Sequence, residues 1–170
     1  MTSLVLTVIG PDKPGLVEQL SKTILQHDGN WLESGFSRLG GKFTGILVVS
    51  VSDEQISSLQ SSLQALQTTG LRITAEISDE AERSGNLRPL TLELIGHDKP
   101  GIVKDISQAL ASRQINVESL NTELVSGSMS AELLFKAEAQ LLAPETLDID
   151  ELQAALENIA SDLMVDITLQ

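Results

Sequence analysis

The sequence predicts an α+β protein in which one β-α-β-β-α-β module occurs twice. Residues 10–17 read GPDKPGLV, and residues 96–103, 86 positions later, read GHDKPGIV. Around each copy, apolar residues recur first with the period of a strand and then with that of a helix. A repeat of this length indicates one supersecondary unit used twice. We therefore expect a first module at 1–79, a linker at 80–88 and a second module at 89–170.

The first half of module one begins with a β-branched and leucine-rich run at 4–9, which is typical of a buried strand. Pro14 then stands where the first turn of a helix tolerates a missing N–H. The helix expected after it carries an apolar stripe from Leu16 to Ile24 and stops at Asp28-Gly29.

The second half of module one is predicted to start with a hairpin. Strands at 31–39 and 43–51 are joined by Gly40-Gly41, a tight-turn signal. Ser52 and Gln55 have the spacing of a capping box, and the helix after them ends at Gly70. Residues 71–77 alternate apolar and polar and form the last strand, with one wet face.

The second module is expected to repeat this order. Its first strand lies at 90–95, and its first helix runs from Pro100 to about residue 113. A strand pair at 115–125 and 129–137 turns at 126–128. The later helix is capped by Asp148, and the last strand is at 163–169. Six residues more than in module one are expected around 141–146. Residues 78–86 have no apolar period and mark the linker.

This order of elements gives an antiparallel four-stranded sheet with both helices on one face, the ferredoxin-like arrangement. Each module then leaves one sheet face and its outer edges uncovered. Symmetric dimers are the commonest use of such edges. We therefore expect a homodimer.

The composition limits the classes of function. The formal net charge is −13, whereas nucleic-acid binding needs clustered Lys and Arg, so we expect no direct contact with nucleic acid or with anionic membranes. The acidity is typical of a soluble surface, or of a face that docks a basic partner. The chain has no cysteine, which excludes disulfides and thiolate metal sites. No run is apolar enough to span a membrane. We expect a cytoplasmic protein.

Catalytic signals are weak. The two histidines are His27 and His97. His27 lies on the apolar stripe of a helix near its end, so we expect a partly buried or capping side chain. His97 is matched in the first module by Pro11, so a shared catalytic role fails. The common protease, hydrolase and nucleotide motifs do not occur. We expect neither enzymatic activity nor a cofactor.

The Asp-Lys-Pro-Gly loop is the best candidate for a site, because it connects a buried strand to a helix. The first amides of that helix point outward at the positive end of its dipole, which suits a carboxylate. The loop aspartate could accept hydrogen bonds from an ammonium group, so that together they would hold a free α-amino acid. The alternative is that the aspartate caps the helix and Pro-Gly only shapes the turn. The candidate residues are Asp12, Gly15, Leu16, Asp98, Gly101 and Ile102.

The loop, the repeat and the element order resemble ACT domains, regulatory modules that bind amino acids. The resemblance implies a ligand where the loop of one module meets the second strand of another, and it adds Asn30 and Asn116 as contacts. The segments GNWLES at 29–34, LGGKFTGI at 39–46 and DLMVDI at 162–167 are similar to the glycine cleavage system transcriptional repressor group. The second module departs from that group, with NVESL at 116–120, so the two sites need not be equivalent.

That resemblance implies a regulator without its own DNA-binding element. It would respond to a small amino acid, with glycine favoured, and act through a DNA-binding transcriptional activator protein. The alternative is a stand-alone ACT amino-acid sensor that regulates a metabolic enzyme. Trp31 is either a contact residue for the partner or part of the core.

Overall fold

The computed structural model describes residues 1–79, 83, 85–129 and 131–170. The chain divides into two compact units, Met1–Glu82 and Arg83–Gln170. Of the linker expected at 80–88, residues 80–82 and 84 lie outside the described residues. Leu87 and Arg88 already belong to the first strand of the second unit.

Both units have the predicted order of elements. The first contains β1 (Thr2–Pro11), α1 (Leu16–Gln26), β2 (Asn30–Leu39), β3 (Lys42–Val51), α2 (Ile56–Ala65) and β4 (Arg72–Ile77), with 3-10 turns η1 (Asp53–Gln55) and η2 (Leu66–Thr69) flanking α2. The second contains β5 (Leu87–His97), α3 (Ile102–Ala111), β6 (Asn116–Ser126), β7 (Leu133–Pro144), α4 (Ile149–Leu163) and β8 (Val165–Leu169).

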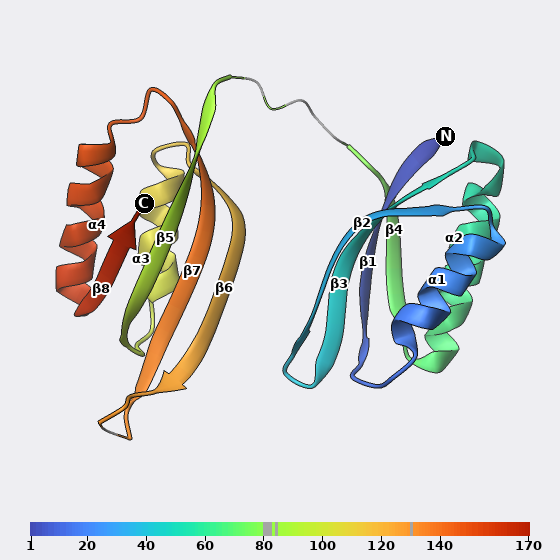
Figure 1. The fold of residues 1–170 in the computed structure, drawn as a ribbon, viewed down its shortest axis with the longest axis horizontal. Coiled ribbons are helices and arrows are strands. Elements are labelled where there is room, and N and C mark those ends of the chain that lie inside the picture. The colour runs from blue at the N-terminus through green and yellow to red at the C-terminus, as the bar shows by residue number, and fades with distance from the viewer. Residues whose placement is uncertain (80–82, 84, 130) are drawn as a thin grey trace. The chain divides into compact units, whose positions relative to one another are not determined.

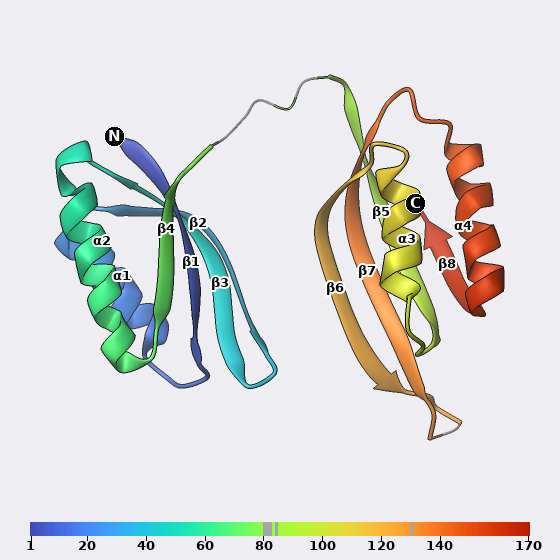
Figure 2. The same ribbon diagram turned by 180° about the vertical axis from the view of Figure 1, so that it is seen from behind.

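The strand order is β2-β3-β1-β4 in one sheet and β6-β7-β5-β8 in the other, with every neighbouring pair antiparallel. Both helices of a unit lie on the same face of its sheet (Figure 1 and, from behind, Figure 2). The predicted α+β class and the two ferredoxin-like modules are therefore confirmed.

The core of each unit lies between the sheet and its helices. Along the central strand, alternate side chains are buried, because successive residues point to opposite faces. In β1 these are Leu4, Leu6 and Val8, and in β5 they are Leu90, Leu92 and Leu94. Burying each such side chain contributes about 1.5–3 kcal/mol. They pack against a stripe at matching positions of the first helix: Leu16, Leu20 and Ile24 in α1, and Ile102, Ile106 and Leu110 in α3.

The predicted starts of the helices need correction. Both α1 and α3 begin one residue after a loop glycine, so Pro14 and Pro100 lie in turns before the helix. The reason is the backbone of Gly15 and Gly101, whose φ angles of 92° and 95° are left-handed and cannot continue a right-handed helix. The predicted capping box is also wrong, because the Ser52 side chain makes no cap hydrogen bond.

The position of the six additional residues is also corrected. Leu6 pairs with Leu47 in the first sheet, and the equivalent Leu92 pairs with Ala139 in the second. The repeat offset is therefore 86 on β5 but 92 on β7. The additional residues lie in the β6–β7 hairpin, which extends past the end of β5 (Figure 1), and not at 141–146. The strand expected at 129–137 is therefore wrong in its bounds: β7 begins at Leu133 and continues to Pro144.

Three local predictions are confirmed. Gly40 and Gly41 both have positive φ, as a two-residue hairpin turn requires. The Asp148 carboxylate caps α4 by accepting hydrogen bonds from the amides of Asp150 at 3.0 Å and Glu151 at 3.3 Å. His27 is half-buried, and its Nδ1 donates to the Thr23 carbonyl at 2.8 Å.

The last helix, α4, is longer than expected. The last strand starts at Val165 and not at 163, because α4 continues to Leu163 and the left-handed Met164 ends it. No helix in the described part of the chain is long and apolar enough to cross a membrane.

The two cap assignments can be tested as a matched pair. Replacing Asp148 by Ala removes the carboxylate that satisfies two amides at the start of α4, and should lower the free energy of unfolding by about 1 kcal/mol. Replacing Ser52 by Ala removes no cap hydrogen bond and should change it by less than half as much. Urea denaturation measures both. Equal losses would contradict the assignment.

Candidate functional site

The start of the helix in each repeated loop is open. The Gly15 carbonyl accepts the first helical hydrogen bond, from the Gln19 amide at 3.0 Å. The amides of residues 16–18 therefore have no partner inside the helix, and no side chain caps them. The second module repeats this geometry, with the Asp105 amide donating to the Gly101 carbonyl at 3.0 Å. The alternative in which Asp12 and Asp98 cap the helices is therefore wrong.

The first loop borders a hollow on the protein surface. It is lined by Asp12, Lys13, Pro14, Gly15, Leu16, Val17, Glu18 and Phe43. Leu16 is only 4% exposed, so its side chain belongs to the core and only its backbone N–H is offered to the hollow. Ile102 is equally buried at the same position of the second module. The structure therefore brings the three predicted residues of the first loop to one hollow: Asp12 with its carboxylate, and Gly15 and Leu16 with their backbone.

Arg38 is a candidate site residue that sequence reasoning missed. Its Nη1 lies 3.2 Å from the Asp12 Oδ2, in a salt bridge between exposed side chains, which contributes little to stability. A ligand can therefore compete for either partner: a carboxylate for Arg38 or an ammonium group for Asp12. The sequence signal that could have placed Arg38 beside Asp12 was the Gly40-Gly41 turn. The turn pairs Arg38 with Phe43, which pairs in turn with Gly10 at the start of the loop.

The second loop has no counterpart of the Arg38 guanidinium. With an offset of 86 on the second strand, the position of Arg38 is occupied by Leu124 in β6. Asp98 therefore faces no guanidinium from that position. His97, next to it, has its Nδ1 3.1 Å from the Glu132 carboxylate. The second loop thus has the Glu132 carboxylate nearby and lacks the arginine that neutralises Asp12 in the first loop.

The structure does not bring Asn30 to the loop of its own module. Asn30 pairs with Ser50, which pairs with Ser3 on β1. Asp12 follows Ser3 by nine residues, just past the end of β1, and is therefore about 30 Å from it at the usual rise of a strand. Asn30 therefore cannot share a site with the Asp12 of the same module.

Asn116 is equally distant from its own loop. It is level with Pro89, since both pair with Leu142. Its side chain donates to the Glu118 carboxylate at 2.5 Å. Hydrogen bonds from Arg83 and then Asn116 hold the pKa of Glu118 below its usual range.

Trp31 packs in the first module. Its ring lies 5.9 Å from that of Phe36, which stacks on Phe43 at 5.2 Å. The indole Nε1 donates to the Ser34 hydroxyl at 3.1 Å. These contacts favour the core role over a contact residue. Among the described residues, no group of three or more His, Asp or Glu side chains is arranged to hold a metal ion.

The family follows from a comparison with known sequences. The family model of the ACT domain matches residues 2–76 and 88–170. Together these segments cover most of the chain, once in each unit. The chain belongs to the ACT domain family and carries two tandem copies of the domain.

Individual relatives agree with this assignment. The UPF0237 protein MMP0657 of Methanococcus maripaludis is 35% identical over 83 residues, which are 48% of this chain and 90% of that protein. A crystal structure of an unknown protein from Galdieria sulphuraria has a TM-score of 0.84 at 28% identity, covering 99% of this chain and 97% of the other.

A second crystal structure, of a protein provisionally named a glycine cleavage system transcriptional repressor, has a TM-score of 0.70 at 22% identity. It covers 99% of this chain and 96% of that one. At that identity the likeness shows a shared fold. This chain is a tandem ACT-domain protein that resembles that repressor group.

The left-handed loop glycine can be tested directly. A Cβ at Gly15 would meet no atom within 4 Å, so the Gly15→Ala variant suffers only from its positive φ, at about 1–2 kcal/mol. Gly35 has equally open space without a positive φ. Gly35→Ala is therefore the matched control and should not destabilise the fold. Thermal unfolding compares the two, and an unchanged Gly15→Ala variant would contradict the assigned conformation.

Proposed function

We propose that this protein is an amino-acid-responsive regulator that controls transcription through a DNA-binding activator protein, without binding DNA itself. On this proposal it is a cytoplasmic homodimer and has no enzymatic activity. The observation that carries the proposal is the loop site. An uncapped helix start and an aspartate adjoin one hollow, in a chain that belongs to a family of regulatory domains.

The chemistry of the loop fits a zwitterion. The first-turn amides of α1 and the positive end of its dipole favour a carboxylate. The Asp12 carboxylate accepts hydrogen bonds from an ammonium group. Lys13 lines the same hollow, and its Nζ donates to the Thr69 carbonyl at 3.0 Å. A bound amino acid would therefore meet the Asp12 carboxylate and the backbone donors of the first turn, while the Glu18 carboxylate, also in the lining, pairs with Lys22.

Glycine as the ligand and a transcriptional activator as the partner are proposed from the resemblance of this chain to the repressor group. Similarity to a protein provisionally named for the glycine cleavage system supports a response to glycine. The net charge of −13 supports contact with a protein and not with DNA, because phosphate repels an acidic surface. On this proposal glycine binding changes how the chain contacts its activator.

Ligand binding should raise the melting temperature. Glycine at ten times its Kd stabilises the folded state by about 1.4 kcal/mol, which amounts to several degrees in domains of this size. Replacing both Asp12 and Asp98 by Ala should abolish the shift, because the ammonium group loses its acceptors. Asp162→Ala, an exposed carboxylate on α4, is the control and should keep it. No shift with any amino acid at millimolar concentration would contradict the site.

The partner is identified by affinity capture from a cell extract with and without glycine. Recovery of a DNA-binding transcriptional activator, with yield dependent on glycine, supports the proposal. Recovery of a biosynthetic enzyme in its place would favour the alternative, a stand-alone amino-acid sensor that regulates metabolism.

A further inference from the structure

The two modules differ in how the space between the first helix and the hairpin is filled. In the first module three rings fill it: Trp31 and Phe36 on β2 and Phe43 on β3. The corrected register, with offsets of 86 on β6 and 92 on β7, gives their equivalents in the second module. They are Val117, Thr122 and Phe135, so one ring of the three is retained.

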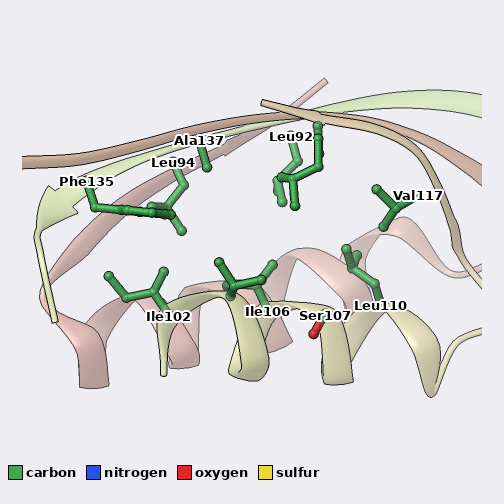
Figure 3. Close-up of a pocket in the computed structure, with 12 residues that line it drawn as sticks. Leu92, Leu94, Ile102, Ile106, Ser107, Leu110, Val117, Phe135 and Ala137 are labelled. Atoms are coloured by element: carbon green, nitrogen blue, oxygen red, sulfur yellow. The ribbon is translucent and has the colours of Figure 1, made fainter. Parts of the chain in front are cut away.

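The loss of two rings leaves an apolar groove between α3 and the β6–β7 strands. It is lined by Leu92, Leu94, Ile102, Val103, Ile106, Ser107, Leu110, Val117, Leu120, Phe135, Ala137 and Ala139, and no charged side chain is among them. Figure 3 shows side chains of α3 and of the sheet facing each other across it. At its mouth, Val117 is 39% and Leu120 48% exposed.

The residues opposite the lost ring, Gly45 in the first module and Ala137 in the second, also differ between the modules. Gly45 lies under Phe36, where a Cβ would come within 2.5 Å of the Phe36 ring. Its equivalent in the second module is Ala137, which pairs with Thr122 and so has no ring opposite its Cβ. The groove is therefore a difference built into both strands of the hairpin.

The groove begins at the loop. Ile102 and Phe135 lie at one end of it and Val117 at the other (Figure 3). Ile102 follows directly on the loop glycine, and Phe135 pairs with Gly96, two residues before Asp98. In the first module the equivalent of Phe135, Phe43, lines the loop hollow. There the Phe36 ring stacks on Phe43, whereas Thr122, at the equivalent position, brings no ring to Phe135.

The size and chemistry of the groove define what can enter it. Its volume is about 50 Å³, smaller than the cavity of about 150 Å³ that holds a benzene ring, so a large side chain would enter it only in part. Water finds no polar network in such a lining, whereas an apolar side chain loses its exposed surface there. Charged groups would remain at the loop end, where Asp98 offers an acceptor and the α3 amides offer donors.

We propose that the second module selects amino acids with a large apolar side chain, such as leucine or phenylalanine, while the first module, whose rings leave no such groove, does not favour them. This rests on the proposed function, because it assumes that both loops hold an α-amino acid. The ligand's ammonium group binds Asp98, its carboxylate binds the first amides of α3, and its side chain lies in the groove.

Calorimetric titration of the full chain with glycine, alanine, leucine and phenylalanine tests the proposal. Leucine and phenylalanine should bind at least about tenfold more tightly than glycine at one site per chain, because burying even part of such a side chain provides that factor. Asp98→Ala should remove this site and leave the glycine site. Asp12→Ala should do the reverse.

Filling the groove is the sharper test. Val117→Trp with Thr122→Phe rebuilds the ring cluster of the first module and should weaken leucine and phenylalanine binding at least tenfold, while glycine binding is unchanged. The single change Val117→Trp should weaken it in the same direction if the double variant folds poorly. Asn121→Trp is the matched control. It adds the same ring on the same strand but pairs with Glu138, on the face away from the helices, and should bind like the parent.

The outcomes separate the two proposals. If glycine binds but leucine and phenylalanine bind no more tightly, the selectivity of the second module is wrong and the proposed function stands. The same conclusion follows if apolar ligands still bind tightly to the filled variants. If no amino acid binds at either loop, both proposals fail.

Discussion

The left-handed backbone at Gly15 and Gly101 determines the geometry of both candidate sites. A residue with φ near +95° turns the chain from the central strand into the helix without any intervening cap. The helix therefore starts with amides that no side chain satisfies, at the edge of a hollow next to Asp12. A residue with a Cβ would avoid this conformation, and a conventional Ser or Asp cap would occupy the same amides.

Around this common geometry the two modules have different surroundings. The first loop has Arg38 beside its aspartate and a stack of three rings behind it. At the equivalent positions the second has Leu124, Val117 and Thr122, and a groove lined by apolar side chains. The first loop thus adjoins a partly polar hollow, whereas the second adjoins a small groove lined by apolar side chains. On the proposal made above, these differences give the two loops different selectivity for amino acids.

How far the sequence could predict this structure depends on how local each signal is. The Gly40-Gly41 turn and the Asp148 cap were predictable because a few adjacent residues determine them. The repeated GPDKPG and GHDKPG loops indicated the candidate sites for the same reason. The starts of α1 and α3 were predicted too early, because a proline that suits the first turn of a helix is equally suited to the turn before it.

The features that were missed depend on contacts between distant segments. The six additional residues were placed at 141–146 because a gap-free alignment continued to match up to Leu133. The pairing of Leu92 with Ala139 places them in the β6–β7 hairpin. Only with that register does Phe135 match Phe43, which makes the missing rings visible. The Asp12–Arg38 pair likewise requires two strands to meet, and the distance between Asn30 and its own loop follows from their opposite ends of the sheet.

The central claim is that the uncapped amides of the two loops bind an amino acid, and amide chemical shifts observe these groups themselves. In a ¹⁵N-labelled sample titrated with glycine and then leucine, the account predicts saturable shifts at residues 15–18 for glycine and at 101–104 for leucine. Amides at the ends of β4 and β8 that lie far from the loops, such as Ile77, which pairs with Leu4, and Leu169, which pairs with Leu92, should move little. Saturable shifts that avoid both loops, or no shifts at millimolar ligand, would contradict it.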